Sequence, residues 1–240
     1  MITVQPIRYT SHTASWHRLA VELGFTAAIA PTPQWSEFDG NGILAVHGVA
    51  AGGPDDGSSG FHLLAGDLEA VAARLAAIGV EVERRHPEDV GPMLVVRAAD
   101  GVTLTVSGEK RAARAGGTSV QPIWYDTDLD RPRQVLEAIG LQPRIVADDG
   151  VWIDFTADGG GLGALHRDTT PRVELSLEFG GDLDALADRL AGAGFRASVV
   201  DEAYNRTLQV TTPDGDVLWV NGTHDDLSGY SRATATPAGN

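Results

Sequence analysis

The stretch VQPIRYT at residues 4–10 returns almost unchanged as VQPIWYD at residues 120–126. The repetition continues along the chain, and self-similarity at a nearly fixed offset is the signature of a duplicated structural unit. The further matching pairs are WSEFDGNGILAVH (35–47) with WIDFTADGGGLGALH (152–166), DLEAVAARLAAIG (67–79) with DLDALADRLAGAG (182–194), and DGVTLTVSG (100–108) with DGDVLWVNG (214–222). The sequence therefore predicts two copies of one domain.

A short polar segment separates the two copies. Residues 109–118 read EKRAARAGGT, which is a composition typical of linkers. The first domain is then residues 1–108 and the second is residues 119–222. Residues 223–240 show no hydrophobic period, and we expect them to form a poorly ordered tail.

Each copy mixes helical and strand periodicity. In the first copy Trp16, Leu19 and Leu23 share one face of a helix predicted over residues 13–24, and a second amphipathic helix is predicted over residues 68–78. Short strands are predicted at residues 26–30, 35–38, 43–46, 61–65, 80–84, 93–97 and 103–107. With a strand before each helix, a copy is a pair of βαβββ units, and the fold class is α+β.

Composition excludes several classes of function. The 240 residues include 33 acidic and 18 basic side chains, for a net charge of −15, and no basic stripe marks a nucleic-acid site. There is no cysteine, no signal-peptide pattern and no apolar run of membrane-spanning length. We expect a soluble cytoplasmic protein with no nucleic-acid or membrane partner. The acidity favours a cationic ligand, or it serves solubility alone.

The repeated openings, the LAVH and GALH strand ends, the DLEAVAARLAAIG-type helix and the closing DGxxLxV strand occur twice in one order. This pattern resembles the vicinal oxygen chelate superfamily, which includes glyoxalase I, bleomycin resistance proteins and extradiol dioxygenases. The resemblance implies a cupped mixed β-sheet in each domain, with the helices outside. It also implies a cavity in which enzymes hold a divalent metal through His, Glu or Gln side chains on the first and last strands of the units.

The resemblance assigns few metal ligands to this chain. Gln5 and Gln121 stand where a metal-dependent relative has its first-strand histidine, and an amide oxygen is a weak neutral ligand. Thr105 and Trp219 stand at the last-strand position, which is usually Glu, and an indole cannot ligate a metal. We therefore predict no metal and no cofactor.

Three histidines keep an alternative open in the first domain. His47 and His166 match each other at the end of the second ligand strand, and His62 lies near the third ligand position of the first copy. The second copy has leucines there. Gln5, His47 and His62 are then the candidate ligands for a divalent metal. The competing interpretation of these histidines is an ordinary strand or turn residue.

Strand alternation predicts what lines the cavities. If Gln5 and Gln121 point inward, so do Tyr9 and Tyr125. Trp219 is expected either in the pocket or in the core. For Trp152, a position in the core or at the domain interface competes with a position in the pocket. Arg8 falls on the opposite face, which suggests a domain edge. The predicted ligand-binding residues are Gln5, Tyr9, His47, His62, Thr105, Gln121, Tyr125, Trp152, His166 and Trp219.

We therefore expect a non-catalytic binding protein of the bleomycin-resistance type for a small cationic or aromatic, antibiotic-like molecule. The alternative is a glyoxalase- or dioxygenase-like metal-dependent lyase, isomerase or dioxygenase working from one degenerate site in the first domain. A third hypothesis is an interaction scaffold. A monomer with an internal pseudo-dimer and a homodimer both remain open.

Overall fold

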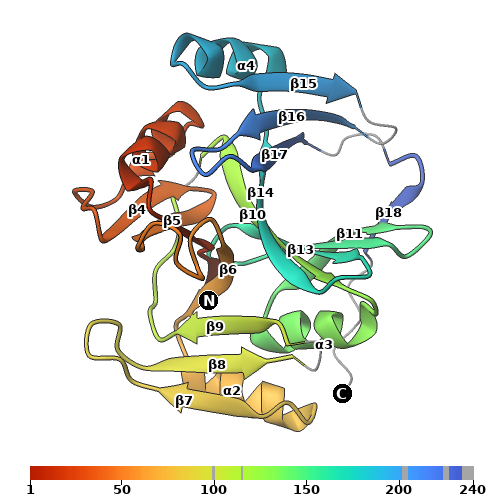
Figure 1. Ribbon diagram of the computed structural model, residues 1–240. Coiled ribbons are helices and arrows are strands. Elements are labelled where there is room, and N and C mark those ends of the chain that lie inside the picture. Colours follow the sequence, from red (N-terminus) through yellow and green to blue (C-terminus); the bar gives the residue numbers. More distant parts are fainter. Residues whose placement is uncertain (99–100, 115, 202–204, 224–226, 234–240) are drawn as a thin grey trace.

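The computed structural model describes residues 1–98, 101–114, 116–201, 205–223 and 227–233. Asp100, which opens the predicted closing strand of the first copy, lies outside the described residues, as do parts of the predicted linker and tail. The chain forms two nine-stranded mixed sheets, one from each half of the sequence, with helices on their outer sides (Figure 1). The α+β prediction with two tandem domains is confirmed.

The first domain places its strands in the order β3-β4-β5-β2-β6-β9-β8-β7, and β1 pairs with β6. Its elements are β1 (Ile2–Val4), β2 (Ile7–Thr10), α1 (Thr13–Glu22), β3 (Thr26–Ala27), β4 (Trp35–Gly40), β5 (Gly42–Gly48), β6 (Ser59–Ala65), α2 (Leu68–Ala77), β7 (Val82–Arg85), β8 (Met93–Arg97) and β9 (Thr103–Ser107).

The second domain repeats this arrangement in the order β15-β16-β17-β14-β10-β13-β12-β11-β18. Its elements are β10 (Thr118–Asp126), α3 (Asp130–Ile139), β11 (Gln142–Ala147), β12 (Trp152–Thr156), β13 (Leu162–Arg167), β14 (Arg172–Phe179), α4 (Leu183–Gly192), β15 (Ala197–Asp201), β16 (Arg206–Thr211), β17 (Val217–Gly222) and β18 (Tyr230–Arg232). The strand β18 lies in the predicted tail and extends the sheet at β11.

Local sequence explains the repeated helices. Asp67 and Asp182 open the matching DLxAxAxRLA segments, and each is an N-cap whose carboxylate accepts backbone N–H groups of the first turn. The buried faces of α1 and α3 carry Trp16 and Pro132 at matching positions. Because each helix buries one apolar stripe against its sheet, the inner faces of the sheets remain for the cavities.

The two domains meet through matching hairpins. The β4–β5 turn reaches β10, where Asn41 N donates to Thr118 O (2.9 Å), and the β12–β13 turn reaches β1, where Val4 N donates to Gly160 O (3.0 Å). The glycine run 159–161 lies in the turn between β12 and β13. Reciprocal contacts of equivalent elements are what an internal two-fold relation produces.

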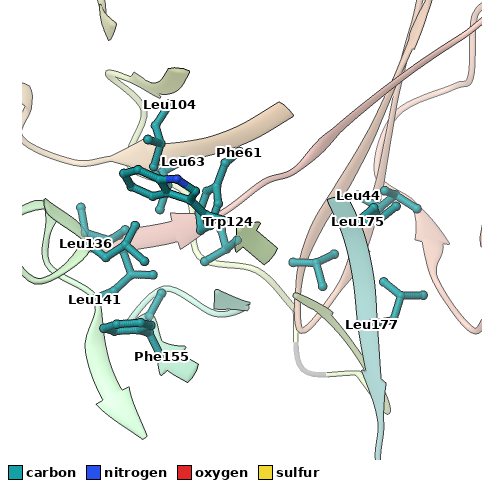
Figure 2. Packing of buried hydrophobic residues seen from close by; sticks show 14 of the residues in the cluster. Leu44, Phe61, Leu63, Leu104, Trp124, Leu136, Leu141, Phe155, Leu175 and Leu177 are labelled. Atoms are coloured by element: carbon teal, nitrogen blue, oxygen red, sulfur yellow. The ribbon is translucent and has the colours of Figure 1, made fainter. Parts of the chain in front are cut away.

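An apolar core continues across this junction. Trp124 of β10 lies among Phe61, Leu63 and Leu104 of the first domain (Figure 2), and its side chain is fully buried. A Cβ placed on Gly163 would approach the ring of Phe61 to 2.8 Å, so the backbone of β13 packs directly on this ring.

Among the described residues, no helix is long and apolar enough to span a membrane.

Candidate ligand-binding site

We call the curved sheets of the first and second domains the first cup and the second cup. The inner face of the second cup encloses a cavity of about 530 Å³. It is lined from β10, β12, β13, β14 and β17, and by Tyr230 of β18. Five of the predicted ligand-binding residues line it: Gln121, Tyr125, Trp152, His166 and Trp219. The other lining residues are Ile123, Val151, Asp154, Arg172, Glu174, Glu178, Asn205, Asn221, Gly222 and Tyr230.

One wall of this cavity is a ladder of rings that crosses four neighbouring strands. Strand register places Trp152 opposite His166, His166 opposite Tyr125, and Tyr125 opposite Arg172. The ring centroids are 5.9 Å apart for Trp152 and His166 and 5.3 Å apart for His166 and Tyr125. The Arg172 guanidinium lies 3.8 Å from the Tyr125 ring centroid, so the ladder ends in a cation–π contact.

The carboxylates of the cavity are tied to two arginines. Arg144 of β11 reaches across the cup and bonds Asp154 of β12 and Glu178 of β14, each at 2.6 Å from Nη2. Arg172 bonds Glu174, also at 2.6 Å. The three carboxylates that line the cavity, Asp154, Glu174 and Glu178, are therefore all paired with an arginine.

This environment keeps the tyrosine of the ladder protonated. Burial, followed by the neighbouring Glu174 carboxylate, raises the pKa of Tyr125 well above its ordinary value of 10. The Glu178 and Asp154 carboxylates raise the pKa of Arg144 and outweigh its burial. At neutral pH the cavity therefore presents neutral phenol and indole groups beside charged carboxylates.

The positions to which the resemblance assigns metal ligands carry other residues in the second cup, and the counterpart of His62 is Ser176 and not a leucine as expected. Gln121 lies opposite Ser176, and Ser176 lies opposite Trp219, so the three side chains form one row across β10, β14 and β17. Ser176 Oγ donates to the carbonyl of Gln121 at 2.7 Å. A glutamine, a serine and an indole do not form the set of N and O ligands that a divalent metal needs.

The corresponding row in the first cup contains Gln5, His62 and Thr105. The Gln5 N–H donates to the carbonyl of His62 (3.0 Å), and His62 Nδ1 shares a 2.6 Å hydrogen bond with Thr105 Oγ1. Burial lowers the pKa of His62 from 6.5 to about 4, so its imidazole is neutral at pH 7. Glu37 of β4 completes this group, because Gln5 Nε2 donates to its Oε1 at 3.2 Å.

His47 lies elsewhere in the first cup. It pairs with Tyr9 and Trp35, at ring-centroid distances of 5.3 and 5.8 Å, and thus repeats the ladder of the second cup. Tyr9 follows Gln5 by four positions, or ~13 Å along an extended chain. The structure thus does not bring His47 to Gln5 and His62. Over the described ranges, no group of three or more His, Cys, Asp or Glu side chains could hold a metal ion.

Several side chains that line the cavity or bond its carboxylates are not indicated by the sequence patterns above. The alternation of Glu174, Ser176 and Glu178 along β14 could have revealed two inward carboxylates. Tyr230 belongs to a three-residue strand without hydrophobic period. Arg144, which reaches Glu178, comes from strand β11, and Arg111, which reaches Glu37 of the first domain, comes from the linker. No spacing in the sequence links either arginine to its partner.

No protein-family model matches this sequence, and no curated protein matches it either. Solved structures do share its fold. The 2,3-dioxygenase LapB from Pseudomonas sp. KL28 aligns over 97% of this chain and 93% of its own, with a TM-score of 0.64 and 12% identity. The halotolerant catechol dioxygenase BphC aligns over 97% and 87%, with a TM-score of 0.56 and 15% identity.

A glyoxalase of known metal content also shares the fold. The Mn(II)-bound glyoxalase from Novosphingobium aromaticivorans aligns over 93% of this chain and 81% of its own, with a TM-score of 0.60 and 14% identity. At such identities the likeness concerns the fold and not the chemistry. The chain thus shares the fold of these dioxygenases and this glyoxalase, which is consistent with the resemblance to the vicinal oxygen chelate superfamily.

Proposed function

We propose that the protein binds a small planar molecule in its second cup and does no chemistry on it. The observation that carries this proposal is the cavity of about 530 Å³ with Trp152, Trp219, Tyr125 and Tyr230 among its lining residues. Cavities of this size with aromatic walls and a few polar groups suit drug-sized ligands. The row of Gln121, Ser176 and Trp219 supports binding over metal chemistry.

The charge of the lining favours a cationic ligand. Three carboxylates, Asp154, Glu174 and Glu178, line the cavity and pair with two arginines, Arg144 and Arg172, so one negative charge is in excess. The whole chain carries a net charge of −15. Aromatic faces attract cations through their quadrupole, and the Arg172–Tyr125 contact is an internal example. An aromatic cation would therefore gain from both the walls and the carboxylates.

Two tricyclic probes of similar shape and opposite charge test this proposal. We expect 9-aminoacridine, a cation at pH 7, to quench tryptophan fluorescence and to raise the melting temperature, and 9-anthracenecarboxylate to do neither. Trp219→Ala and Trp152→Ala should each weaken 9-aminoacridine binding about tenfold or more, because each removes one aromatic wall of the cavity. A tenfold loss of affinity corresponds to about 1.4 kcal/mol of binding free energy.

The repeat supplies the matched control. Trp35 occupies in the first cup the place of Trp152 in the second, and Trp35→Ala should leave the affinity unchanged. Equal losses in the Trp35 and Trp152 variants would refute binding in the second cup. Binding of neither probe, or tighter binding of the anion, would refute the proposed ligand class.

A second candidate function is metal-dependent catalysis from the first cup, as in the dioxygenases and the glyoxalase that share the fold. The observation that favours it is the buried group of Gln5, His62 and Glu37, in which Gln5 contacts both other residues. The fit is incomplete, because the Glu37 carboxylate is held by the linker residue Arg111.

Metal analysis of protein purified without chelator separates the two functions. Near-stoichiometric Mn, Fe, Ni or Zn that is lost in His62→Ala and kept in His166→Ala would establish a first-cup metal site and refute a purely binding role. Metal below a tenth of an equivalent, with unchanged content in both variants, would remove the enzymatic candidate.

We also propose that the protein works as a cytoplasmic monomer. The reciprocal hairpin contacts support a monomer because each domain already uses the other as its partner. The absence of cysteine is compatible with a reducing compartment. Light scattering at two concentrations and fractionation of the source cells test these two statements, and a stable 50 kDa species (about twice the chain mass) would contradict the first.

A further inference from the structure

The polar groups of the second cup divide into those that the chain itself satisfies and those that it leaves open. The carboxylates of Asp154, Glu174 and Glu178 are of the first kind, because each is paired with an arginine. The Gln121 amide is of the second kind. Its Oε1 accepts from Asn221 Nδ2 at 3.4 Å, and none of the described residues bonds its Nε2. The cup therefore keeps one amide NH₂ group without a partner.

This NH₂ group opens onto the cavity and is not sealed inside the protein. Gln121 is 2% exposed and lines the cavity of the second cup. Over the described part of the chain, the enclosed side-chain atoms without a partner are Ser107 Oγ and His166 Nδ1, so Gln121 Nε2 is not enclosed. The small exposed surface of Gln121 thus faces the cavity, and a ligand there can reach the NH₂ group.

The first cup shows the same amide with a partner. Gln5 is the repeat counterpart of Gln121, and its Nε2 donates to Glu37 Oε1 at 3.2 Å. The counterpart of Glu37 in the second cup is Asp154, which is one methylene shorter. The Asp154 carboxylate accepts from the backbone N–H of Ile145 at 2.8 Å instead. The second cup thus lacks the acceptor that the first cup supplies to this amide.

The open amide lies in one row with an aromatic wall of the cavity. Strand register places Gln121 of β10 opposite Ser176 of β14, and Ser176 opposite Trp219 of β17 (Figure 1). Because neighbouring strands are ~4.8 Å apart, the backbones at Gln121 and Trp219 are ~10 Å apart. A planar ring system that packs on the Trp219 indole can therefore bring a substituent to the amide.

The charge of the lining decides which acceptor suits this NH₂ group. The three carboxylates and two arginines leave one negative charge in excess, so a carboxylate or phosphate on the ligand would be repelled. A carbonyl oxygen accepts a hydrogen bond without adding charge. We propose that the ligand of the second cup carries a neutral carbonyl oxygen on its planar rings, and that Gln121 Nε2 donates to it. This inference rests on the proposed binding function of the second cup and specifies its ligand.

Xanthone and xanthene test the proposal, because these uncharged tricycles differ only in a carbonyl against a methylene group at one position. We expect the unchanged protein to bind xanthone more tightly than xanthene, as measured by quenching of tryptophan fluorescence. Gln121→Met keeps the length of the side chain and removes its NH₂ group. This substitution should weaken xanthone binding about tenfold, because the carbonyl loses its donor, and should not weaken xanthene binding.

A matched substitution and a second measurement support the comparison. Gln142 is an exposed glutamine at the start of β11, outside the cavity lining, and Gln142→Met should leave the affinities for both tricycles unchanged. The carbonyl stretching frequency of xanthone bound to the unchanged protein should be lower than that of xanthone in hexane, since a hydrogen bond weakens the C=O bond. This infrared measurement needs no variant, so it decides if Gln121→Met does not fold.

Three results would overturn this inference and leave the proposed function standing. The first is a protein that binds 9-aminoacridine through Trp152 but does not prefer xanthone to xanthene. The second is an equal loss of affinity for both tricycles in Gln121→Met, and the third is a carbonyl frequency equal to that in hexane. If neither 9-aminoacridine nor xanthone binds, the proposed function fails together with the inference.

Discussion

His62 is a neutral, buried imidazole in the first cup, and its burial makes stability depend on pH. Its pKa is about 4 in the folded chain against 6.5 for the exposed group. Between these values the unfolded chain binds a proton and the folded chain does not. The contribution is therefore fully present above pH 6.5 and is lost as the pH falls toward 4.

We predict that lowering the pH from 7.5 to 5 costs about 2 kcal/mol of unfolding free energy through His62. His62→Gln, which can still bond Thr105, should remove this part of the pH dependence. Urea unfolding of both proteins at the two pH values measures the difference. An identical pH dependence in both proteins would show that folding does not lower the pKa of His62.

At the residue scale, the sequence repeat predicted several lining residues of the second cup but not the ion pairs among them. Gln121 and Tyr125 follow from strand alternation, and His166 follows from its match with His47. Trp152 was expected as much in the core or at an interface as in the pocket, which it lines. The ion pairs could not be foreseen, because Arg144 and Glu178 are brought together only when the sheet curves and β11 faces β14. Curvature depends on twist and packing along the whole sheet, and no single spacing encodes it.

At the scale of elements, two hairpin glycines meet where the domains join. Gly42 and Gly161 are repeat counterparts, and both have positive φ, at 87° and 89°. A Cβ on Gly161 would lie 2.6 Å from Val4 Cβ, and a Cβ on Gly42 would lie 2.9 Å from Gly161 Cα. Each position therefore requires glycine for two reasons, the positive φ and the close approach of backbone to backbone.

We predict that Gly161→Ala lowers the unfolding free energy by roughly 2–4 kcal/mol. Alanine is strained at the positive φ of this position, and its Cβ would clash with Val4 Cβ. Gly192→Ala is the matched control. Gly192 ends helix α4 with free space around it, so alanine there should be neutral or stabilising by up to about 1 kcal/mol. Chemical denaturation measures both, and equal effects of the two substitutions would contradict the junction argument.

Most elements were predictable, and the exceptions have tertiary causes. Helices with an aspartate N-cap and an apolar stripe can be predicted from the sequence. The repeated QP dipeptide shows what local sequence does not predict. Strand β10 runs unbroken through Pro122, but the first strand is split at Pro6 into β1 and β2. In the first domain β6 pairs with these two pieces in separate ladders, a difference of partner and not of local sequence.

At the scale of the whole molecule, the two sides of the domain junction have diverged. Trp124 fills an apolar core on one side, and its repeat counterpart Arg8 forms a polar network on the other. Arg8 is 4% exposed, and its Nε donates to Asp214 of the second domain at 2.9 Å. A homodimer would have to use the same residue at both places. A tandem chain can use a tryptophan once and an arginine once.

This asymmetry makes the Arg8 network a specific lock between the domains. Asp214 is 7% exposed and accepts from Arg8, from Thr10 and from Trp16 Nε1 at 2.7 Å. Asp216 also bonds Arg8 but is 50% exposed. Loss of one partner from a buried charged network leaves the other charge without compensation, and such losses cost about 3–5 kcal/mol.

We predict that Asp214→Asn lowers the unfolding free energy by about 2–4 kcal/mol, slightly less than a complete loss because Asp216 still bonds Arg8. Asp216→Asn should cost under about 1 kcal/mol, since its carboxylate is half exposed to water. Trypsin cleavage in the linker should accelerate only in Asp214→Asn, because separation of the domains breaks the bond from Ala113 N to Gly159 O that holds the linker in place. If the two variants lose equal stability, or if the linker stays protected in both, the domains are held together by the Trp124 core alone.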